Sequence, residues 1–257
     1  MNMEKMFDFS NANALIMGGG SGIGKEIAKA LCKNGASVII SGRSIKKLNA
    51  TKKEIDILHQ GACNVYVSDI SIKSSVEELI SYTSELFSGR LNILVNSAGV
   101  NVRGPIEEVT LEDFEEVMSI NLTGTFLATK LAYSLLKSAE YGRVINLASI
   151  FSTVSFPHRL SYSSSKAGVL LFSKTVALEW AEQGITVNTI SPGPLLTEIN
   201  KKVLEDKENY EKFCERIPMR RFGEPYEIVT AALFLASPYS SYVTGSDIVV
   251  DGGWTST

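Results

Sequence analysis

Short apolar runs alternate along the chain with longer segments in which apolar residues recur at helical spacing. The short runs predict strands at Ala14–Met17, Ser37–Ser41, Val65–Val67, Leu91–Val95, Val144–Ala148, Thr186–Ile190 and Asp247–Val250. The longer segments predict helices at Ile23–Asn34, Ser74–Phe87, Tyr162–Gln183 and Pro225–Ala236, and two helices that meet near Asn121 within Leu111–Ser138.

This alternation places the chain in the α/β class. The predicted strands are continuous apolar runs, which is typical of a parallel sheet that helices cover on both faces. No repeat, low-complexity linker or shift in composition divides the sequence. We therefore expect a single domain that spans residues 1–257.

Composition narrows the class of protein further. A chain of 257 residues can bury a large core, and its net charge of −3 gives no sign of a nucleic-acid partner. No apolar run approaches the roughly 20 residues of a membrane span, and Met1–Asn13 lacks the apolar centre of a signal peptide. Cys32, Cys63 and Cys214 are too far apart for a metal site and odd in number. These features predict a cytoplasmic protein with reduced thiols, no membrane contact and no metal.

A glycine-rich turn follows the first predicted strand and opens the first predicted helix. It reads Gly18-Gly19-Gly20-Ser21-Gly22-Ile23-Gly24. Glycines allow the backbone to approach a pyrophosphate closely, and the free N–H groups of the helix favour an anion there. The spacing differs from G-x-G-x-x-G, but the position between strand and helix predicts a dinucleotide-binding turn.

The end of the second strand bears on the choice of cofactor. An acid at this point would bind the adenosine ribose of NAD, but the chain has Gly42 followed by Arg43 and Ser44. Arg43 can pair with a 2′-phosphate, so the sequence favours NADP(H). NAD(H) stays open as the alternative if Arg43 is only a solvated loop residue. Asp69, after the third strand, is placed to accept a hydrogen bond from adenine, or else to cap the turn that follows.

Tyr162 and Lys166 are four residues apart, which puts both side chains on one face of a helix. A nearby ammonium lowers the pKa of a tyrosine, which is otherwise near ~10. Ser149 lies just past another predicted strand, thirteen residues before Tyr162, where its hydroxyl can hold a substrate oxygen against the tyrosine. Asn121, a polar residue among helical apolar neighbours, can interrupt its helix and hold a water that relays protons to Lys166.

Together these residues resemble the short-chain dehydrogenase/reductase family over nearly the whole chain. The family's T-G-x-x-x-G-I-G turn corresponds to residues 17–24, N-N-A-G to residues 96–99 and P-G-x-x-x-T to residues 192–197. Its Asn-Ser-Tyr-Lys tetrad corresponds to Asn121, Ser149, Tyr162 and Lys166. Met17 and Ser97 depart from the usual threonine and asparagine, which bears on local hydrogen bonding more than on the tetrad.

The resemblance implies a Rossmann-type, doubly wound sheet of seven parallel strands and a homotetramer. It also implies an oxidoreductase in which Tyr162 exchanges a proton with the substrate oxygen, Ser149 orients that oxygen, Lys166 binds the nicotinamide ribose and Asn121 supports a proton relay. Hydride then moves between the nicotinamide and the substrate carbon. The predicted cofactor-binding residues are Gly18, Ser21, Gly22, Ile23, Gly24, Arg43, Ser44, Asp69, Ile70, Asn96, Ala98, Gly99, Tyr162, Lys166, Pro192, Gly193, Leu195 and Thr197.

The substrate pocket is expected along residues 100–104, residues 150–160 and the segment after Pro192, with residues 195–218 as a mobile lid. The predicted substrate-binding residues are Arg103, Ser149, Phe151, His158 and Tyr162. Basic groups at the pocket mouth, including Arg159, suit a polar or anionic substrate such as a sugar acid or hydroxy acid, unless they face solvent or subunit contacts. We therefore expect the substrate to be a sugar acid, a polyol or another small polar hydroxy compound.

In its overall sequence the chain is similar to the gluconate 5-dehydrogenase-like and the 3-oxoacyl-[acyl-carrier-protein] reductase-like members of the family. Glu140 and Glu182 dilute the basic surface that an acidic carrier protein would need, so the acyl reductase is the second choice. A nucleotide-sensing regulator would not need the complete tetrad. An epimerase would normally carry an extended substrate domain.

Overall fold

The computed structural model describes residues 6–256. Its centre is one seven-stranded sheet in the order β3-β2-β1-β4-β5-β6-β7, in which every pair of neighbouring strands is parallel. The strands are β1 (Asn13–Met17), β2 (Ser37–Gly42), β3 (Cys63–Val67), β4 (Ile93–Asn96), β5 (Gly142–Leu147), β6 (Ile185–Pro192) and β7 (Asp247–Val250). The predicted seven-stranded, doubly wound Rossmann-type sheet is confirmed.

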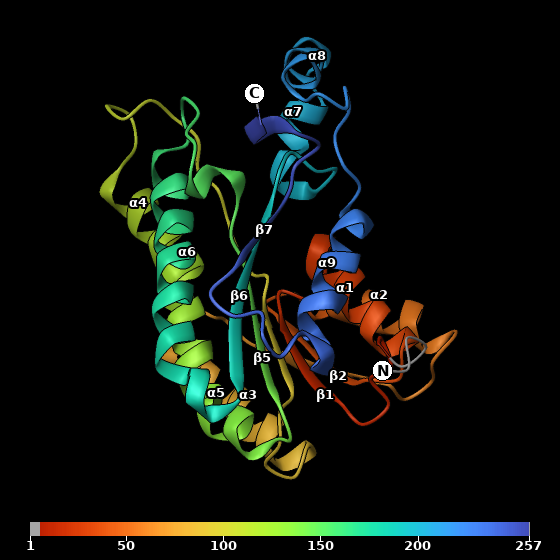
Figure 1. Cartoon of the computed structure of the whole chain (residues 1–257). Coiled ribbons are helices and arrows are strands. Elements are labelled where there is room, and N and C mark those ends of the chain that lie inside the picture. The colour runs from red at the N-terminus through yellow and green to blue at the C-terminus, as the bar shows by residue number, and fades with distance from the viewer. Residues whose placement is uncertain (1–5, 257) are drawn as a thin grey trace.

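Helices cover both faces of the sheet (Figure 1). The helices are α1 (Gly22–Lys33), α2 (Ile45–Asp56), α3 (Lys73–Leu86), α4 (Leu111–Met118), α5 (Gly124–Ser138), α6 (Leu160–Trp180), α7 (Lys201–Leu204), α8 (Lys207–Arg216) and α9 (Val229–Ala236). One layer holds α1, α2 and α9, and the other holds α3, α5 and α6. Of the helices in residues 6–256, none is long and apolar enough to cross a membrane.

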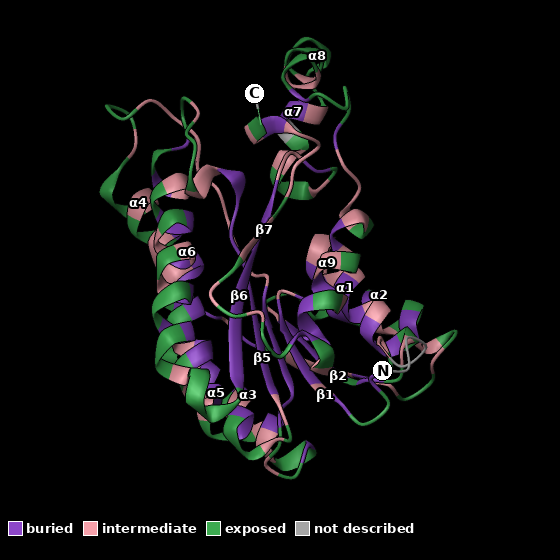
Figure 2. Ribbon diagram, in the orientation of Figure 1, coloured by how far each residue is buried: buried purple, intermediate pink, exposed green. Residues whose placement is uncertain are grey.

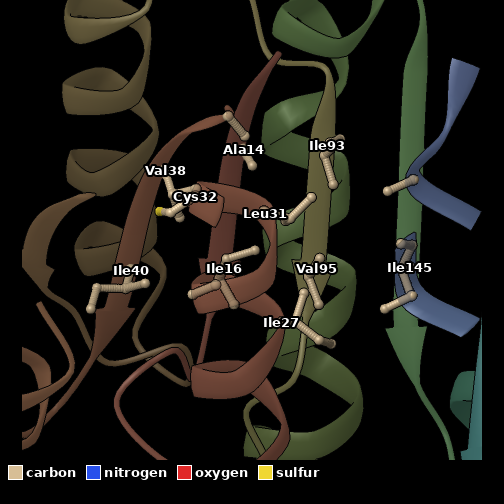
Figure 3. Close-up of a cluster of buried hydrophobic side chains, with 14 of the residues drawn as sticks. Ala14, Ile16, Ile27, Leu31, Cys32, Val38, Ile40, Ile93, Val95 and Ile145 are labelled. Atoms are coloured by element: carbon tan, nitrogen blue, oxygen red, sulfur yellow. The ribbon is translucent and has the colours of Figure 1, made fainter. Parts of the chain in front are cut away.

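Alternate residues of each strand serve the two layers. In β1, Ala14 and Ile16 pack against α1, whereas Leu15 and Met17 belong to the cluster under α3 and α5. Figure 3 shows the first cluster, where Ile27 and Leu31 of α1 lie over the strands. Both faces of the sheet are therefore buried, as Figure 2 shows. A ligand can then bind only at the ends of the strands, and in open parallel sheets it binds at their carboxyl ends.

The sequence pattern did not predict α2, and it placed the ends of several other helices one or more residues away from where the structure has them. Helix α2 reads IKKLNATKKEID and buries only Leu48, Thr51 and Ile55, so its apolar stripe is narrow. Helix α6 starts two residues before the predicted Tyr162, and it ends at Trp180, before a short 3-10 turn. The predicted meeting of two helices near Asn121 is confirmed, because a π-helical turn at Ser119–Thr123 joins α4 to α5.

Candidate active site

The carboxyl ends of the strands surround two joined cavities. The larger, of about 800 Å³, lies along the loops after β1, β2, β3 and β4. The smaller, of about 100 Å³, lies beside the ends of β5 and β6 and the start of α6. Gly99, Asn101 and Thr197 are among the residues that line both, so a molecule in the larger cavity can reach the smaller one.

The glycine turn brings backbone close to backbone at the floor of the larger cavity. Gly18 has a φ of +81°, and a Cβ atom there would lie 2.7 Å from the backbone nitrogen of Ala98. Ser21 precedes α1 without capping it by a side-chain hydrogen bond, and the first turn of α1 has no acid. The turn therefore offers a close approach to its backbone and the N-terminus of α1, which fit the pyrophosphate of a dinucleotide.

The far end of the larger cavity is basic. Arg43 and Ser44 line it as predicted, together with Lys47 from the first turn of α2. Lys47 Nζ forms an ion pair of 2.5 Å with Glu198 Oε2 across the cleft. Sequence analysis missed Lys47 because it missed α2, the helix that places this lysine beside Arg43.

Asp69 lines the same cavity, and one of its carboxylate oxygens is hydrogen-bonded to Ser71. Its Oδ1 accepts hydrogen bonds from the backbone N–H and the hydroxyl of Ser71, at 2.9 and 2.6 Å. Burial opposes the charge of this carboxyl, but the bonds from Ser71 and the positive charge of Arg43 outweigh burial and lower its pKa. Asp69 therefore caps the turn, the alternative role considered above, and stays ionised as an acceptor that lines the cleft.

Ser149, Tyr162 and Lys166 meet in the smaller cavity. Ser149 follows β5 and accepts a hydrogen bond from the Phe151 N–H at 3.1 Å. Burial raises the pKa of Tyr162, while its hydrogen bond with Ser149 and the positive charge of Arg159 oppose that rise. The serine and tyrosine side chains thus line one cavity and act on each other electrostatically, as joint binding of one substrate oxygen requires.

Lys166 is buried behind the tyrosine. Its Nζ donates to the Leu147 carbonyl oxygen at 2.5 Å and lies 5.8 Å from the centre of the Tyr162 ring. Burial lowers the pKa of Lys166 to about 8, because desolvation disfavours the ammonium. The positive charge that acts on the Tyr162 hydroxyl is that of Arg159. The sequence pattern did not indicate a catalytic role for this arginine.

Asn121 lies in the π-helical turn, fully buried. Its Oδ1 accepts from the Val100 N–H at 2.8 Å, and its Nδ2 donates to the Val100 carbonyl at 3.0 Å and to Ser165 Oγ at 2.9 Å. Asn121 Oδ1 and Lys166 Nζ both flank Gly99, at 3.4 and 3.6 Å from where its Cβ would lie. The side chain thus fixes the loop after β4, and its predicted part in a proton relay stays a prediction.

Most of the predicted site residues line one or both cavities. They are Gly18, Ser21, Gly22, Ile23, Arg43, Ser44, Asp69, Ile70, Ala98, Gly99, Arg103, Ser149, Phe151, Tyr162, Lys166, Pro192, Gly193, Leu195 and Thr197. Gly24, Asn96, Asn121 and His158 lie outside the linings. Asn96 is buried in the sheet, where its amide donates to Thr129 and Asn146, and His158 is exposed with a φ of +64°.

Residues 195–218 lie over the cavities and carry α7 and α8. Val203 and Ile217 of this segment are buried in an apolar cluster with Ile150, Phe222 and Trp254. Arg103 Nη2 reaches the segment from the opposite rim and donates to the Ile199 carbonyl at 3.1 Å and to Asn200 Oδ1 at 3.2 Å. These contacts suit the predicted lid, whose movement stays a prediction.

Residues 18–255 match a family model described as enoyl-(acyl carrier protein) reductase. The chain is 36% identical over 248 residues to glucose 1-dehydrogenase of Gluconobacter oxydans, covering 96% of this chain and 93% of that one. The chain belongs to the short-chain dehydrogenase/reductase family. This short-chain dehydrogenase/reductase is also 36% identical to 3-oxoacyl-[acyl-carrier-protein] reductase of Synechocystis, over 93% of this chain and 95% of the relative.

A solved member of the family has nearly the same fold. Gluconate 5-dehydrogenase of Burkholderia cenocepacia, solved in complex with NADP and tartrate, superposes with a TM-score of 0.92 at 31% identity and covers 98% of each chain. The resemblance found in the sequence is therefore confirmed, and this short-chain dehydrogenase/reductase is an oxidoreductase.

Proposed function

We propose that the protein interconverts a secondary alcohol and a ketone on a sugar acid, a polyol or another small polar hydroxy compound, with NADP(H) as cofactor. The observation that carries the proposal is the meeting of Ser149, Tyr162 and Lys166 in a cavity that joins the glycine-turn cleft. A dinucleotide in that cleft supplies the hydride for reduction or accepts it in oxidation.

Each of these three residues has a defined task. In reduction, the Tyr162 hydroxyl donates its proton to the carbonyl oxygen, and in oxidation the phenolate accepts the alcohol proton. Ser149 donates a hydrogen bond to the same oxygen and holds it against the tyrosine. Lys166, held by the Leu147 carbonyl, is the proposed partner of the nicotinamide ribose and supports the phenolate by its charge.

The size of the smaller cavity and two polar residues of its otherwise largely apolar lining favour a small substrate with polar groups. Its volume is about 100 Å³, and Asn101 and Arg159 are among its lining residues. Glucose and gluconate appear in the names of two relatives, whereas a third is named for an acyl-carrier-protein substrate. Glu140 and Glu182 are exposed, which disfavours docking of an acidic carrier protein.

Initial rates of NADPH oxidation test the proposal. We expect turnover with a keto-sugar acid or another small polar ketone and a lower rate with an acetoacetyl thioester, with NADH measured in parallel. Turnover on the thioester alone would make the protein an acyl reductase. Failure with every oxo compound would overturn the proposal as a whole.

The preference for NADP(H) leads to a prediction on Arg43. Arg43→Ala is expected to weaken NADPH binding about 10–100-fold by removing a charge-assisted bond to the 2′-phosphate, while NADH binding changes little. Fluorescence titration of both cofactors measures the effect. Lys46→Ala is the control, since Lys46 is exposed and does not line the cleft. Equal weakening of NADPH and NADH would refute the assignment.

We also propose a homotetramer, as the family resemblance implies. Leu171 and Leu178 on α6 are 66% and 83% exposed, and Leu111 at the start of α4 is 65% exposed, which leaves apolar surface for a subunit contact. Native mass spectrometry is expected to show a species of four chains, each of 28.0 kDa. A single chain at all concentrations would contradict this. A cytoplasmic location stays a prediction.

A further inference from the structure

Arg159 is a buried cation that no acid in residues 6–256 pairs with. It precedes α6 directly and is 6% exposed. Its one side-chain hydrogen bond within that part of the chain runs from Nη1 to the adjacent His158 carbonyl oxygen, at 3.2 Å. A guanidinium has five N–H donors, and burying it without an anion costs free energy. Most of the binding capacity of Arg159 is therefore unused.

Arg159 lies at the wall of the catalytic cavity. Arg159 lines it together with Ser149, Tyr162 and Lys166, and no acidic residue is among the lining residues in the described part of the chain. The charge of Arg159 acts on the Tyr162 phenol, three residues further on. Burial and the charge of Arg103 lower the pKa of Arg159 to about 10, so the guanidinium is still protonated at neutral pH. The cavity thus has an excess of positive charge next to the reacting hydroxyl.

Two neighbouring groups complete a polar surface. Arg103 lines the adjoining cavity, has no ion pair in residues 6–256, and repels Arg159 electrostatically. Asn101 lines both cavities, and its Oδ1 is buried without a hydrogen-bond partner in the described part of the chain. Two guanidinium groups and a free acceptor oxygen match a ligand that carries both a carboxylate and a hydroxyl group.

We infer that Arg159 binds a carboxylate of the substrate, close to the carbon that reacts. This inference rests on the proposed function and narrows it to hydroxy acids and oxo acids. Arg159 and Tyr162 belong to the same start of α6, so one small molecule contacts both only if its carboxylate and its reacting oxygen are near each other. A short hydroxy acid meets this condition, whereas a sugar acid that reacts at the end remote from its carboxylate does not.

The test compares acids with their neutral analogues. Rates of NADPH-dependent reduction are measured for short 2-oxo and 3-oxo acids and for the methyl esters of the same acids. Arg159→Met keeps an unbranched side chain but removes the charge. We expect it to lower kcat/KM for the acid about 10–100-fold, from loss of a charge-assisted bond, and to change kcat/KM for the ester less than about threefold. Arg159→Lys is expected to lie between.

Controls separate binding from folding. Arg90→Met changes an exposed arginine outside both cavities and should leave the acid-to-ester ratio unchanged. Thermal unfolding of each variant shows whether Arg159→Met still folds. Calorimetric titration of the enzyme with NADPH and a non-reacting hydroxy acid gives a dissociation constant that does not depend on turnover, and it should rise by the same factor as kcat/KM falls.

The outcomes distinguish this inference from the function on which it rests. Equal losses on acid and ester, or no loss on either, would overturn the role of Arg159 while leaving the dehydrogenase assignment in place. A wild-type enzyme that prefers neutral polyols or remote sugar acids would do the same. A wild-type enzyme that reduces no oxo compound at all would overturn the proposed function itself.

Discussion

Tyr162→Phe is expected to lower turnover about 10²–10⁴-fold, because the variant loses the hydroxyl that exchanges a proton with the substrate oxygen. Cofactor binding should persist, since the glycine turn and Arg43 line the other cavity. The ring can keep its edge-on contact with Phe151, whose centre is 6.5 Å away. Steady-state rates and a fluorescence titration with NADPH measure the two effects separately.

Tyr239→Phe serves as the matched control, because Tyr239 is 44% exposed and lies outside both cavities. It should leave the rate and the cofactor affinity unchanged. If Tyr162→Phe kept a rate within a few-fold of the wild type, the acid–base role of the tyrosine would be wrong. A nucleotide-sensing function, indifferent to the hydroxyl, would then become the better explanation.

Asn121→Ala is expected to reduce the free energy of unfolding by about 2–4 kcal/mol, because several buried partners lose their hydrogen bonds together. The N–H and carbonyl of Val100 and the hydroxyl of Ser165 all bond to this one amide. Turnover should fall as well, since the loop that holds Gly99 between Asn121 and Lys166 loses its anchor. Urea unfolding and steady-state rates are the measurements.

Asn49→Ala is the control for that loss. Asn49 is exposed on α2, and alanine is a better helix former, so stability should stay constant or rise slightly. A loss below about 0.5 kcal/mol for Asn121→Ala, the range of an ordinary surface substitution, would show that the amide network contributes little to stability.

The parts of the site that the sequence predicts are those set by local spacing. The glycine turn, the end of β2 and the Tyr162–Lys166 pair depend on residues a few positions apart, and the strand pattern says where they converge. Ser149 was predicted because parallel strands end at one edge of the sheet. The break between α4 and α5 was indicated by a polar residue, Asn121, within an apolar helical pattern, whereas its π-helical geometry was not.

The remaining features depend on contacts between distant parts of the chain. Helix α2 was missed because its surface is mostly lysine and polar residues, and Lys47 was missed with it. The ion pair between Lys47 and Glu198 joins residues 151 positions apart, which no local pattern can indicate. From the sequence, Arg159 was expected only to be one of several basic groups at the mouth of the pocket. Its burial, without an acidic partner in residues 6–256, is what gives it a specific role.

Two polar contacts between residues 195–218 and the rim of the cleft differ in how they respond to dissolved salt. Lys47 and Glu198 are 48% and 68% exposed, so counterions screen their attraction within the Debye length of about 10 Å at 0.1 M. Arg103 instead bonds to uncharged oxygens of Ile199 and Asn200 and is partly desolvated. Rising ionic strength therefore weakens the contact at Glu198 and leaves the Arg103 contacts, at the next two residues, in place.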